Sequence, residues 1–246
     1  MKAMIFAAGL GTRLHPLTTR TPKALVCPHD KPMLQLVAQK LIRAGVNQLV
    51  INIHHHPELM KNFIQSMRFQ GVEITISDES DQLLDTGGGL MKASEWLRGN
   101  DPIILHNVDV LSDVDLQAML KFHMQHNPLV TLAVSARPAN RSFLWQQGRL
   151  VGWENKNLQE KVFFGREESY IIRPMAFSGI HIVQPDLFSL ISEKGVFSIT
   201  PVYLRLAQKH KIIPFEHPYN HWVDMGSFEK LKTASDLLQK NPTAFL

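Results

Sequence analysis

The first thirty residues constrain this chain more than any other segment. The apolar run 3–8 ends in Gly9 and Gly11, and the basic residues Arg13 and Lys23 follow. This order is expected of a backbone that wraps phosphate groups, because glycines let main-chain N–H groups approach an anion and the cations neutralise it. The sequence therefore predicts a loop that offers both basic side chains to a polyphosphate.

Two familiar phosphate loops do not match this segment. A dinucleotide fingerprint, G-x-G-x-x-G, needs a small residue where this chain has Leu14. It also needs an acid at the end of the second strand, whereas the first acid after the loop is Asp30, in a proline-flanked stretch. The P-loop pattern G-x-x-x-x-G-K-[ST] occurs nowhere in the chain.

Hydrophobic periodicity predicts strands alternating with helices in the first half. The predicted strands are 3–8, 48–53, 72–77, 102–106 and 129–136. The predicted helices begin at Pro32, Pro57, Leu90 and Asp113. Such alternation indicates right-handed βαβ units in a mainly parallel sheet, with helices on its faces.

The pattern changes near Arg141. Short strands at 148–153, 175–183 and 211–215, helices at 185–191, 199–210 and 227–239, and a polar exposed insertion at 154–170 are predicted. With 246 residues and 44% apolar content, we expect one α/β domain around one core.

Composition excludes several classes of function. The net charge of +4 is spread without a dense basic stripe, which argues against nucleic acid as a partner. No apolar run approaches the roughly 18 residues of a membrane helix. The single Cys27 cannot form an internal disulfide, and this favours a cytoplasmic protein. The modest positive charge suits small polyanionic substrates.

The loop Gly9-Leu-Gly-Thr-Arg13, continued by Pro16-Leu-Thr and Pro22-Lys23, resembles the signature of the sugar-1-phosphate nucleotidylyltransferases. The resemblance implies their nucleotide-diphospho-sugar transferase fold, a Rossmann-like mixed sheet. It implies one domain over 1–246, with a nucleotide-binding half at 1–140 and a sugar-phosphate half at 141–246. The nucleotide contacts it implies are Ala7, Ala8, Gly9, Gly11, Thr12, Arg13, Lys23, Asp85, Gly87, Gly88 and Asn107.

Two acids are candidate metal ligands. Asp109 directly follows the predicted strand 102–106, where a carboxylate can hold a metal or close an Asx turn. Asp224 precedes a predicted helix and is equally compatible with a turn. The resemblance implies that both bind Mg²⁺, whose preferred ligands are carboxylate and phosphate oxygens. Val108 departs from the family, which has glycine there, and we expect it to narrow the space beside the nucleotide.

The remaining motifs have two interpretations each. The glycines at 87–89 suit a flexible turn, while the resemblance implies base or ribose contact through Gly87 and Gly88, with Asp85 nearby. Glu154 and Lys156 suit an exposed strand end.

The resemblance implies that Glu154 and Lys156 contact the sugar phosphate. Ser178 and Gly179 suit tight packing in a core strand, whereas the family lines its sugar pocket with this stretch. The run His54–His56 is a poor zinc site, because consecutive strand residues alternate in direction.

The resemblance implies transfer of a nucleoside monophosphate from an NTP to a sugar 1-phosphate. In this scheme Arg13 holds the departing pyrophosphate, Lys23 lies between the reacting phosphates, and Asp109 anchors the metal. The likeness is to short N-acetylmuramate-1-phosphate uridylyltransferases and mannose-1-phosphate guanylyltransferase-like enzymes. A non-catalytic regulatory protein of the same fold is the alternative, although a pure binder has no need of both metal acids. The nucleobase, the sugar and the oligomeric state are left open.

Overall fold

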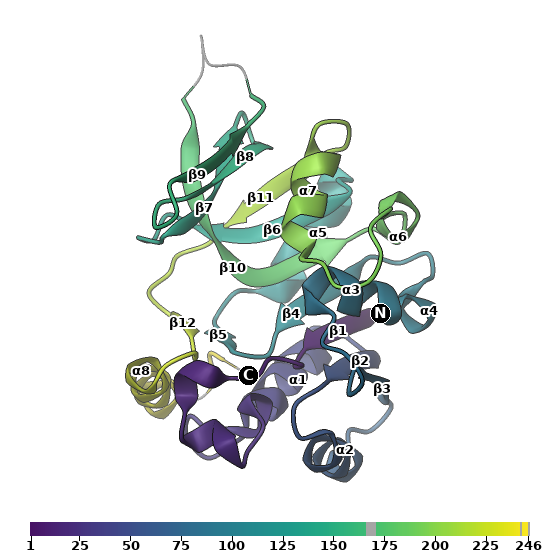
Figure 1. The fold of residues 1–246 in the computed structure, drawn as a ribbon, viewed down its shortest axis with the longest axis vertical. Helices are drawn as coiled ribbons and strands as arrows, with labels where there is room; N and C mark the ends of the chain where they lie inside the picture. Colours follow the sequence, from purple (N-terminus) through teal and green to yellow (C-terminus); the bar gives the residue numbers. More distant parts are fainter. Residues whose placement is uncertain (166–170, 242, 246) are drawn as a thin grey trace.

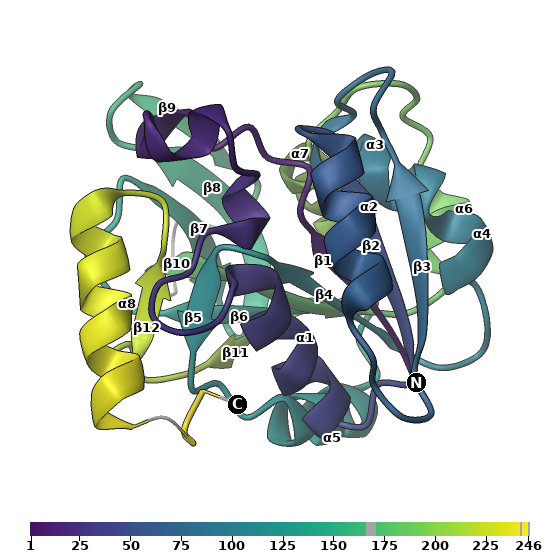
Figure 2. The same ribbon diagram turned by 90° about the horizontal axis from the view of Figure 1, so that it is seen from below.

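One large mixed β-sheet runs through the molecule, with helices packed on both of its faces (Figures 1 and 2). The computed structural model describes residues 1–165, 171–241 and 243–245. The predicted architecture, a mixed and mainly parallel central sheet flanked by helices, is confirmed.

The first half of the chain forms the parallel part of the sheet. The strand β1 (Lys2–Phe6) lies between β2 (Gln48–Ile53) and β4 (Ile103–Asn107), and β3 (Glu73–Asp78) pairs with β2 at the edge. All these pairings are parallel, so the strands end at the same side of the sheet. Ligands of open α/β sheets bind at this side.

The second half continues the sheet through one antiparallel strand. The eleven-residue β10 (Arg173–Val183) lies between β4 and β6 (Val130–Ser135), antiparallel to both. The strand β11 (Ile212–Glu216) then pairs with β6 in parallel. Because β10 joins both halves through backbone hydrogen bonds, the two halves of the chain share one sheet.

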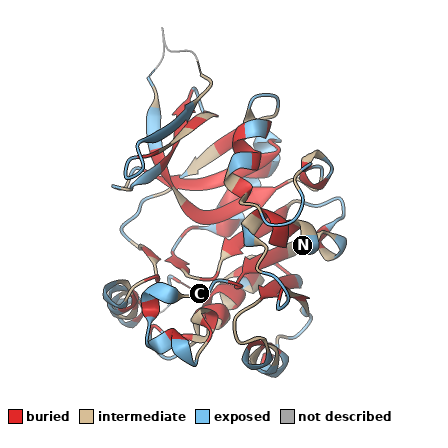
Figure 3. Cartoon of the chain, viewed as in Figure 1, coloured by how far each residue is buried: buried red, intermediate tan, exposed pale blue. Residues whose placement is uncertain are grey.

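Two layers of helices cover the sheet, and strand residues alternate between them. Ala3 and Ile5 of β1 face one buried cluster, while Met4 and Phe6 face the other, as the two-residue strand period requires. The buried residues follow the sheet in Figure 3. The helices of the first layer are α1 (Met33–Arg43), α2 (Pro57–Ser66), α5 (Leu116–His126) and α8 (Phe228–Lys240). Those of the second are α3 (Asp85–Lys92), α4 (Ser94–Leu97), α6 (Leu187–Leu190) and α7 (Ile199–Ala207).

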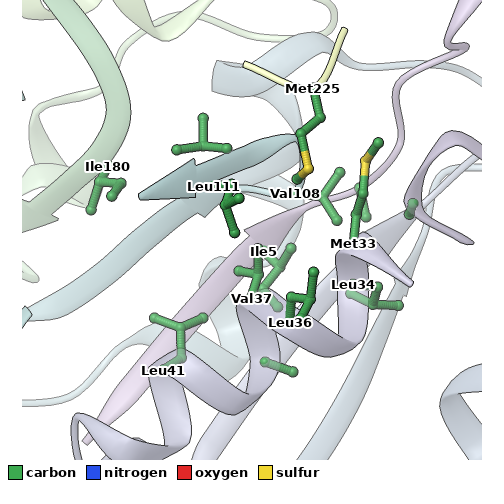
Figure 4. Packing of buried hydrophobic residues seen from close by; sticks show 14 of the residues in the cluster. Ile5, Met33, Leu34, Leu36, Val37, Leu41, Val108, Leu111, Ile180 and Met225 are labelled. Carbon is green, nitrogen blue, oxygen red and sulfur yellow. The ribbon is translucent and has the colours of Figure 1, made fainter. Parts of the chain in front are cut away.

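The apolar face of α1 shows how the first cluster is built (Figure 4). Met33, Val37 and Leu41 recur at helical spacing and are buried against the sheet. Pro32 precedes the helix as its N-cap instead of occupying the first helical position that the sequence predicted. Met225, from the C-terminal part of the chain, belongs to the same cluster.

The predicted helix at 90–98 is wrong in its start and its continuity. The helix α3 already begins at Asp85 and contains all three glycines, and a separate turn of helix, α4, follows. The N–H groups of Gly87 and Gly88 both donate to the carbonyl of Phe197, at 2.9 and 3.2 Å. A partner distant in sequence therefore supports this glycine-rich first turn, which propensity alone disfavours.

Three further strands form an arm beside the main sheet. The strands β7 (Arg141–Gln146), β8 (Arg149–Asn155) and β9 (Glu160–Phe163) pair antiparallel in order, and β7 pairs with the start of β10. The sequence missed β7 and β9. Of the predicted polar insertion at 154–170, residues 166–170 lie outside the described residues.

A two-stranded ribbon completes the fold. The short strands β5 (Val110–Ser112) and β12 (Trp222–Asp224) pair antiparallel next to the carboxyl end of β4. In the described part of the chain, every helix is too short or too polar to cross a membrane.

Candidate active site

Two adjoining cavities lie at the carboxyl ends of β1 and β4. Phe6 and Asn107, the last residues of these strands, are partners in the parallel register, and Val108 N–H donates to Phe6 O over 3.1 Å. The segments that leave the two strands therefore begin side by side. The loop after β1 supplies Gly9 and Lys23 to the first cavity.

The first cavity has a volume of about 410 Å³. Its described lining residues are Phe6, Ala8, Gly9, Lys23, Asn52, Glu79, Leu83, Asp85, Thr86, Asn107, Val108, Asp109 and Val196. We call this the loop cavity. Val108 does line it, at the position where glycine was expected from the family.

The second cavity, of about 770 Å³, faces the arm, and we call it the arm cavity. Its polar and aromatic lining residues include Arg13, Asn107, Asp109, Arg137, Asn140, Arg141, Ser142, Trp153, Asn155, Asn157, Trp222 and Asp224. Among the described residues, only Asn107 and Asp109 line both cavities. A ligand in one cavity would therefore meet a ligand in the other at these two side chains.

The ribbon of β5 and β12 brings the two predicted metal acids to one place. Asp109 directly precedes β5, and Asp224 ends β12 opposite Val110. Beyond this pair, Met225 N–H donates to Asp109 O over 2.7 Å. Both carboxylates consequently line the arm cavity, although they are far apart in the sequence.

Three cations surround these carboxylates. The Lys23 ammonium group contacts Asp109 Oδ2, and both side chains are mostly shielded from solvent. Lys230 Nζ lies 3.2 Å from Asp224 Oδ2, and Arg13 Nη1 lies 4.0 Å from the same oxygen. A Cβ on Gly226 would lie 2.5 Å from Arg13 Nη2, so this glycine permits the approach of Arg13.

The acids fit a divalent metal. Asp224 Oδ1 is buried and has no hydrogen-bond partner within the described residues. A buried carboxylate oxygen without a partner is costly, and a bound cation would satisfy it. Two protein carboxylates suit Mg²⁺, which takes its other ligands from water and substrate phosphates. Among the described residues, His54–His56 included, no group of three His, Cys, Asp or Glu side chains is arranged to hold a metal, so the candidate site has two protein carboxylates.

Most other predicted nucleotide contacts divide into lining and supporting positions. Ala8, Gly9, Lys23, Asp85 and Asn107 line the loop cavity. The supporting positions, which line neither cavity, are Ala7, Gly11, Thr12, Gly87 and Gly88.

Two of the supporting positions, Ala7 and Gly11, stabilise the conformation of the phosphate loop without lining a cavity. Ala7 N–H donates to Asn52 Oδ1 over 2.7 Å. Gly11 has a φ of +68°, and a Cβ there would lie 2.9 Å from that of Lys23. Glycine at this position therefore lets the loop fold back onto Lys23.

The glycines of α3 pack against the chain before α7. A Cβ on Gly87 would lie 2.3 Å from the Phe197 ring, and one on Gly88 would lie 2.3 Å from Gly195 O. Their N–H groups already bond to Phe197 O. The expected base contact through their backbone stays a prediction; the close packing against 195–197 accounts for both glycines on its own.

Sequence reasoning missed a buried polar pair that holds the loop cavity together. Asn52 Nδ2 donates to Glu79 Oε1 over 2.7 Å, and Glu79 Oε2 accepts from Leu84 N–H over 3.1 Å. Both side chains are buried and line the cavity. Together with the Ala7 bond, they connect the phosphate loop to the start of α3. A polar residue inside the otherwise apolar strand 48–53 was the available signal.

On the arm, the cavity is lined by some of the expected residues and by neighbours of others, and the expected sugar-phosphate contacts stay a prediction. Asn155 and Asn157 line the arm cavity, whereas Glu154 and Lys156 do not. Lys156 Nζ instead lies 3.8 Å from Glu154 Oε1. Strand side chains alternate between faces, so a shift of one residue changes the face. Gly179 lines the cavity with φ +76°, while Ser178 is buried behind it and accepts from Arg137.

Three buried histidines of the sheet and its helices are neutral at pH 7. Burial lowers the pKa of His106 in β4 and of His181 in β10 to about 3 each. His181 is hydrogen-bonded to the Tyr203 hydroxyl over 2.6 Å. Burial also lowers the pKa of His123, on α5, to about 4.

The family model described as nucleotidyl transferase matches residues 2–241. The chain belongs to this family. The family resemblance found in the sequence is thereby confirmed.

The match to two curated relatives covers different shares of their length. This nucleotidyl transferase is 28% identical over 241 residues to the N-acetylmuramate alpha-1-phosphate uridylyltransferase of Caulobacter vibrioides, and the match covers 91% of each chain. It is also 28% identical over 234 residues to mannose-1-phosphate guanylyltransferase 1 of Arabidopsis thaliana, across 92% of this chain. The chain spans 61% of the length of that guanylyltransferase.

Solved structures share the fold. The inositol-1-phosphate CTP transferase from T. maritima superposes with a TM-score of 0.76 at 18% identity, covering 98% of this chain and 96% of that one. A UDP-glucose pyrophosphorylase complexed with UDP-glucose gives 0.74 at 20% identity, covering 98% and 99%.

Proposed function

We propose that this chain transfers a nucleoside monophosphate from a nucleoside triphosphate to a sugar 1-phosphate and releases pyrophosphate. The single observation that carries the proposal is the meeting of two cavities at Asn107 and Asp109, beside Lys23. One cavity begins at the phosphate loop and suits the nucleotide. The other suits the acceptor. The names of the uridylyltransferase and guanylyltransferase relatives support the same reaction class.

The reaction needs positioning and charge neutralisation more than proton transfer. An oxygen of the sugar phosphate attacks the α-phosphorus, and the bond to the bridging oxygen breaks, so that its electron pair leaves with pyrophosphate. The acceptor oxygen is already ionised at neutral pH, so no general base is required. Lys23 would lower the repulsion between the two phosphates as they approach. Arg13 lines the arm cavity beside Asp224 and would have to reach from there to the junction of the cavities to hold the departing pyrophosphate.

Asp109 and Asp224 would hold Mg²⁺. When bound, Mg²⁺ would neutralise charge on the phosphate oxygens of the substrate. Lys23 and Lys230 each already contact one of these carboxylates, and would keep them oriented. We place the reaction in the cytoplasm, in line with the lone Cys27.

A substrate panel tests the proposal. The chain is incubated with each of five NTPs (ATP, CTP, GTP, UTP and dTTP), Mg²⁺ and mannose, glucose or N-acetylmuramate 1-phosphate, and pyrophosphate release is measured. We expect release only when NTP, acceptor and metal are all present. A Lys23→Ala protein purified in the same way controls for contaminating activity. Tight binding of NTP or sugar phosphate without release in any combination would identify a regulatory binder instead.

A further inference from the structure

The arm cavity contains an arginine with no role in the mechanism described so far. Three arginines line it within the described residues: Arg13, Arg137 and Arg141. Arg13 lies next to Asp224 and is mostly exposed, and Arg141 is exposed at the start of β7. Arg137, which follows β6, is partly buried and held by many contacts. It is therefore the arginine most restricted in position.

One edge of the Arg137 guanidinium group is fixed by hydrogen bonds. Nη1 donates to Ser135 Oγ over 2.7 Å and to Ser178 Oγ over 3.0 Å, and Nη2 donates to Phe177 O over 2.5 Å. Ser178 is itself fixed, because its hydroxyl is also hydrogen-bonded to His217 Nε2 over 2.8 Å. The partners come from β6 and β10, so the sheet itself sets the orientation of the group.

One face of the guanidinium group is fixed by stacking. Its Cζ lies 3.6 Å from the centre of the Trp222 ring, within range of a strong cation–π contact. Trp222 Nε1 in turn donates to Ser178 O over 3.0 Å. Because Trp222 begins the strand that ends at Asp224, this stacking places Arg137 near the metal acids.

A pair of donors stays available. Among the described residues, no partner contacts Nε–H or the second N–H of Nη2. In a planar guanidinium group, Nε–H and one N–H of Nη2 lie along a common edge, and such an edge matches two oxygens of a phosphate. No described carboxylate forms an ion pair with Arg137, although a half-buried cation is costly without an anion. Burial lowers the pKa of Arg137 to about 10, and the negative charge of Asp224 acts in the other direction and raises it. The group is therefore charged at neutral pH.

We propose that Arg137 binds the phosphate group of the sugar 1-phosphate with this free edge. The inference rests on the proposed function, and it gives Arg137 the acceptor-side charge that the sequence had attributed to Lys156. The position near Asp224 places the bound phosphate at the end of the cavity where it must meet the nucleotide. The rigid support suits a group that orients an attacking oxygen.

Steady-state kinetics of Arg137→Met and Arg137→Lys test this assignment, using the NTP and acceptor of the panel that turn over fastest. Both variants should raise the KM for the sugar 1-phosphate about 10- to 100-fold, because a lysine cannot reproduce the two-pronged contact. The KM for NTP should change less than about 2-fold. In reverse, the KM for NDP-sugar should rise while that for pyrophosphate stays constant.

The matched control is Arg173→Met, which removes an exposed arginine of the adjacent β10 that pairs with Glu216 and lines neither cavity. It should leave both KM values unchanged. If Arg137 only stabilises the sheet, Arg137→Met will lower the melting temperature and kcat but leave the KM for the sugar 1-phosphate unchanged. Arg137→Lys will then also leave that KM unchanged. This pair of results would overturn the proposal. Absence of turnover in the unmodified chain would instead refute the proposed function, before any variant is measured.

Discussion

Met225 donates its backbone N–H to the carbonyl oxygen of Asp109 over 2.7 Å, one step beyond the last residue pair of the β5–β12 ribbon. This bond fixes the two segments that carry Asp109 and Asp224. Asp224 ends β12, and Asp109 lies in the two-residue turn that connects β4 to β5, so both acids are adjacent to the ribbon. The paired segments would hold both acids for the metal binding proposed above, and the proposed reaction makes that role measurable.

Asp109→Asn should keep the fold and lose turnover by on the order of 10²-fold or more, the scale of one major electrostatic contact to a transition state. The substitution preserves shape and removes one negative charge. Turnover is measured across a Mg²⁺ titration, with circular dichroism to confirm folding. Near-normal rates at saturating Mg²⁺ would show that Asp109 only terminates the strand.

Lys23→Ala should chiefly lower kcat. If Lys23 lies between the two reacting phosphates, its effect grows as they approach each other, so its loss is felt mainly in the transition state. Initial rates over a matrix of NTP and acceptor concentrations separate kcat from both KM values. An effect confined to the KM for NTP would mean that Lys23 is a ground-state contact.

Arg13→Ala should raise the KM for NTP and also lower kcat, because the outer phosphates are held both before reaction and as they leave. In the reverse direction, pyrophosphate affinity should fall more than NDP-sugar affinity. Kinetics in both directions test this expectation. A variant with unchanged pyrophosphate affinity would show that Arg13 has another role.

Gly88→Ala should destabilise the fold by about 1–3 kcal/mol, as overpacking does. The added Cβ would lie 2.3 Å from the carbonyl of Gly195, which is backbone and cannot rotate away. We also expect a higher KM for NTP, because Asp85 and Thr86 line the loop cavity from the same helix. Urea unfolding measures the loss. The control is Gly99→Ala, whose Cβ meets only the end of the Lys2 side chain, at ordinary distances.

Stability should fall as the pH drops below about 6.5, the ordinary pKa of histidine. The folded-state pKa of His123 is lowered to about 4, so between these values the unfolded chain binds more protons than the folded one. Because the pKa values of His106 and His181 are lowered to about 3, the pH range over which stability is lost extends down to about pH 3. Each contributes up to about 1.4 kcal/mol of lost stability per pH unit.

Urea unfolding at pH 7 and pH 5 measures this pH dependence. His123→Gln should reduce it, because it removes one of the histidines whose pKa folding lowers. Equal pH dependence in the variant and the unmodified chain would mean that His123 is not neutral in the folded state.

Much of the fold and part of the site could be predicted from the sequence. Lys23 and Gly9 belong to one contiguous motif, and the strand ahead of Asp109 is a clear apolar run. Local patterns of this kind need no knowledge of tertiary contacts. The start of the helix at the glycines 87–89 was predicted wrongly, because this helix depends on a tertiary contact with Phe197, which is far along the chain.

The arm could not be predicted to the residue. Which of Glu154 and Asn155 faces the cavity depends on the pairing of β8 with β7, and β7 was not recognised. A strand whose partner is unknown has no assigned face. Arg137 was missed similarly, since the groups that fix it come from β6, β10 and β12.

Within the described residues, Asn107 and Asp109 alone line both cavities, and under the proposed function this separation has an evolutionary consequence. If the arm cavity holds the acceptor and the loop cavity holds the nucleotide, substitutions along the arm would alter the choice of acceptor and leave the walls around the nucleotide unchanged, and the reverse would also hold. Lineages built on this scaffold can therefore drift in sugar preference and in base preference along separate mutational paths. Substitutions of the two shared residues, Asn107 and Asp109, would affect both cavities at once.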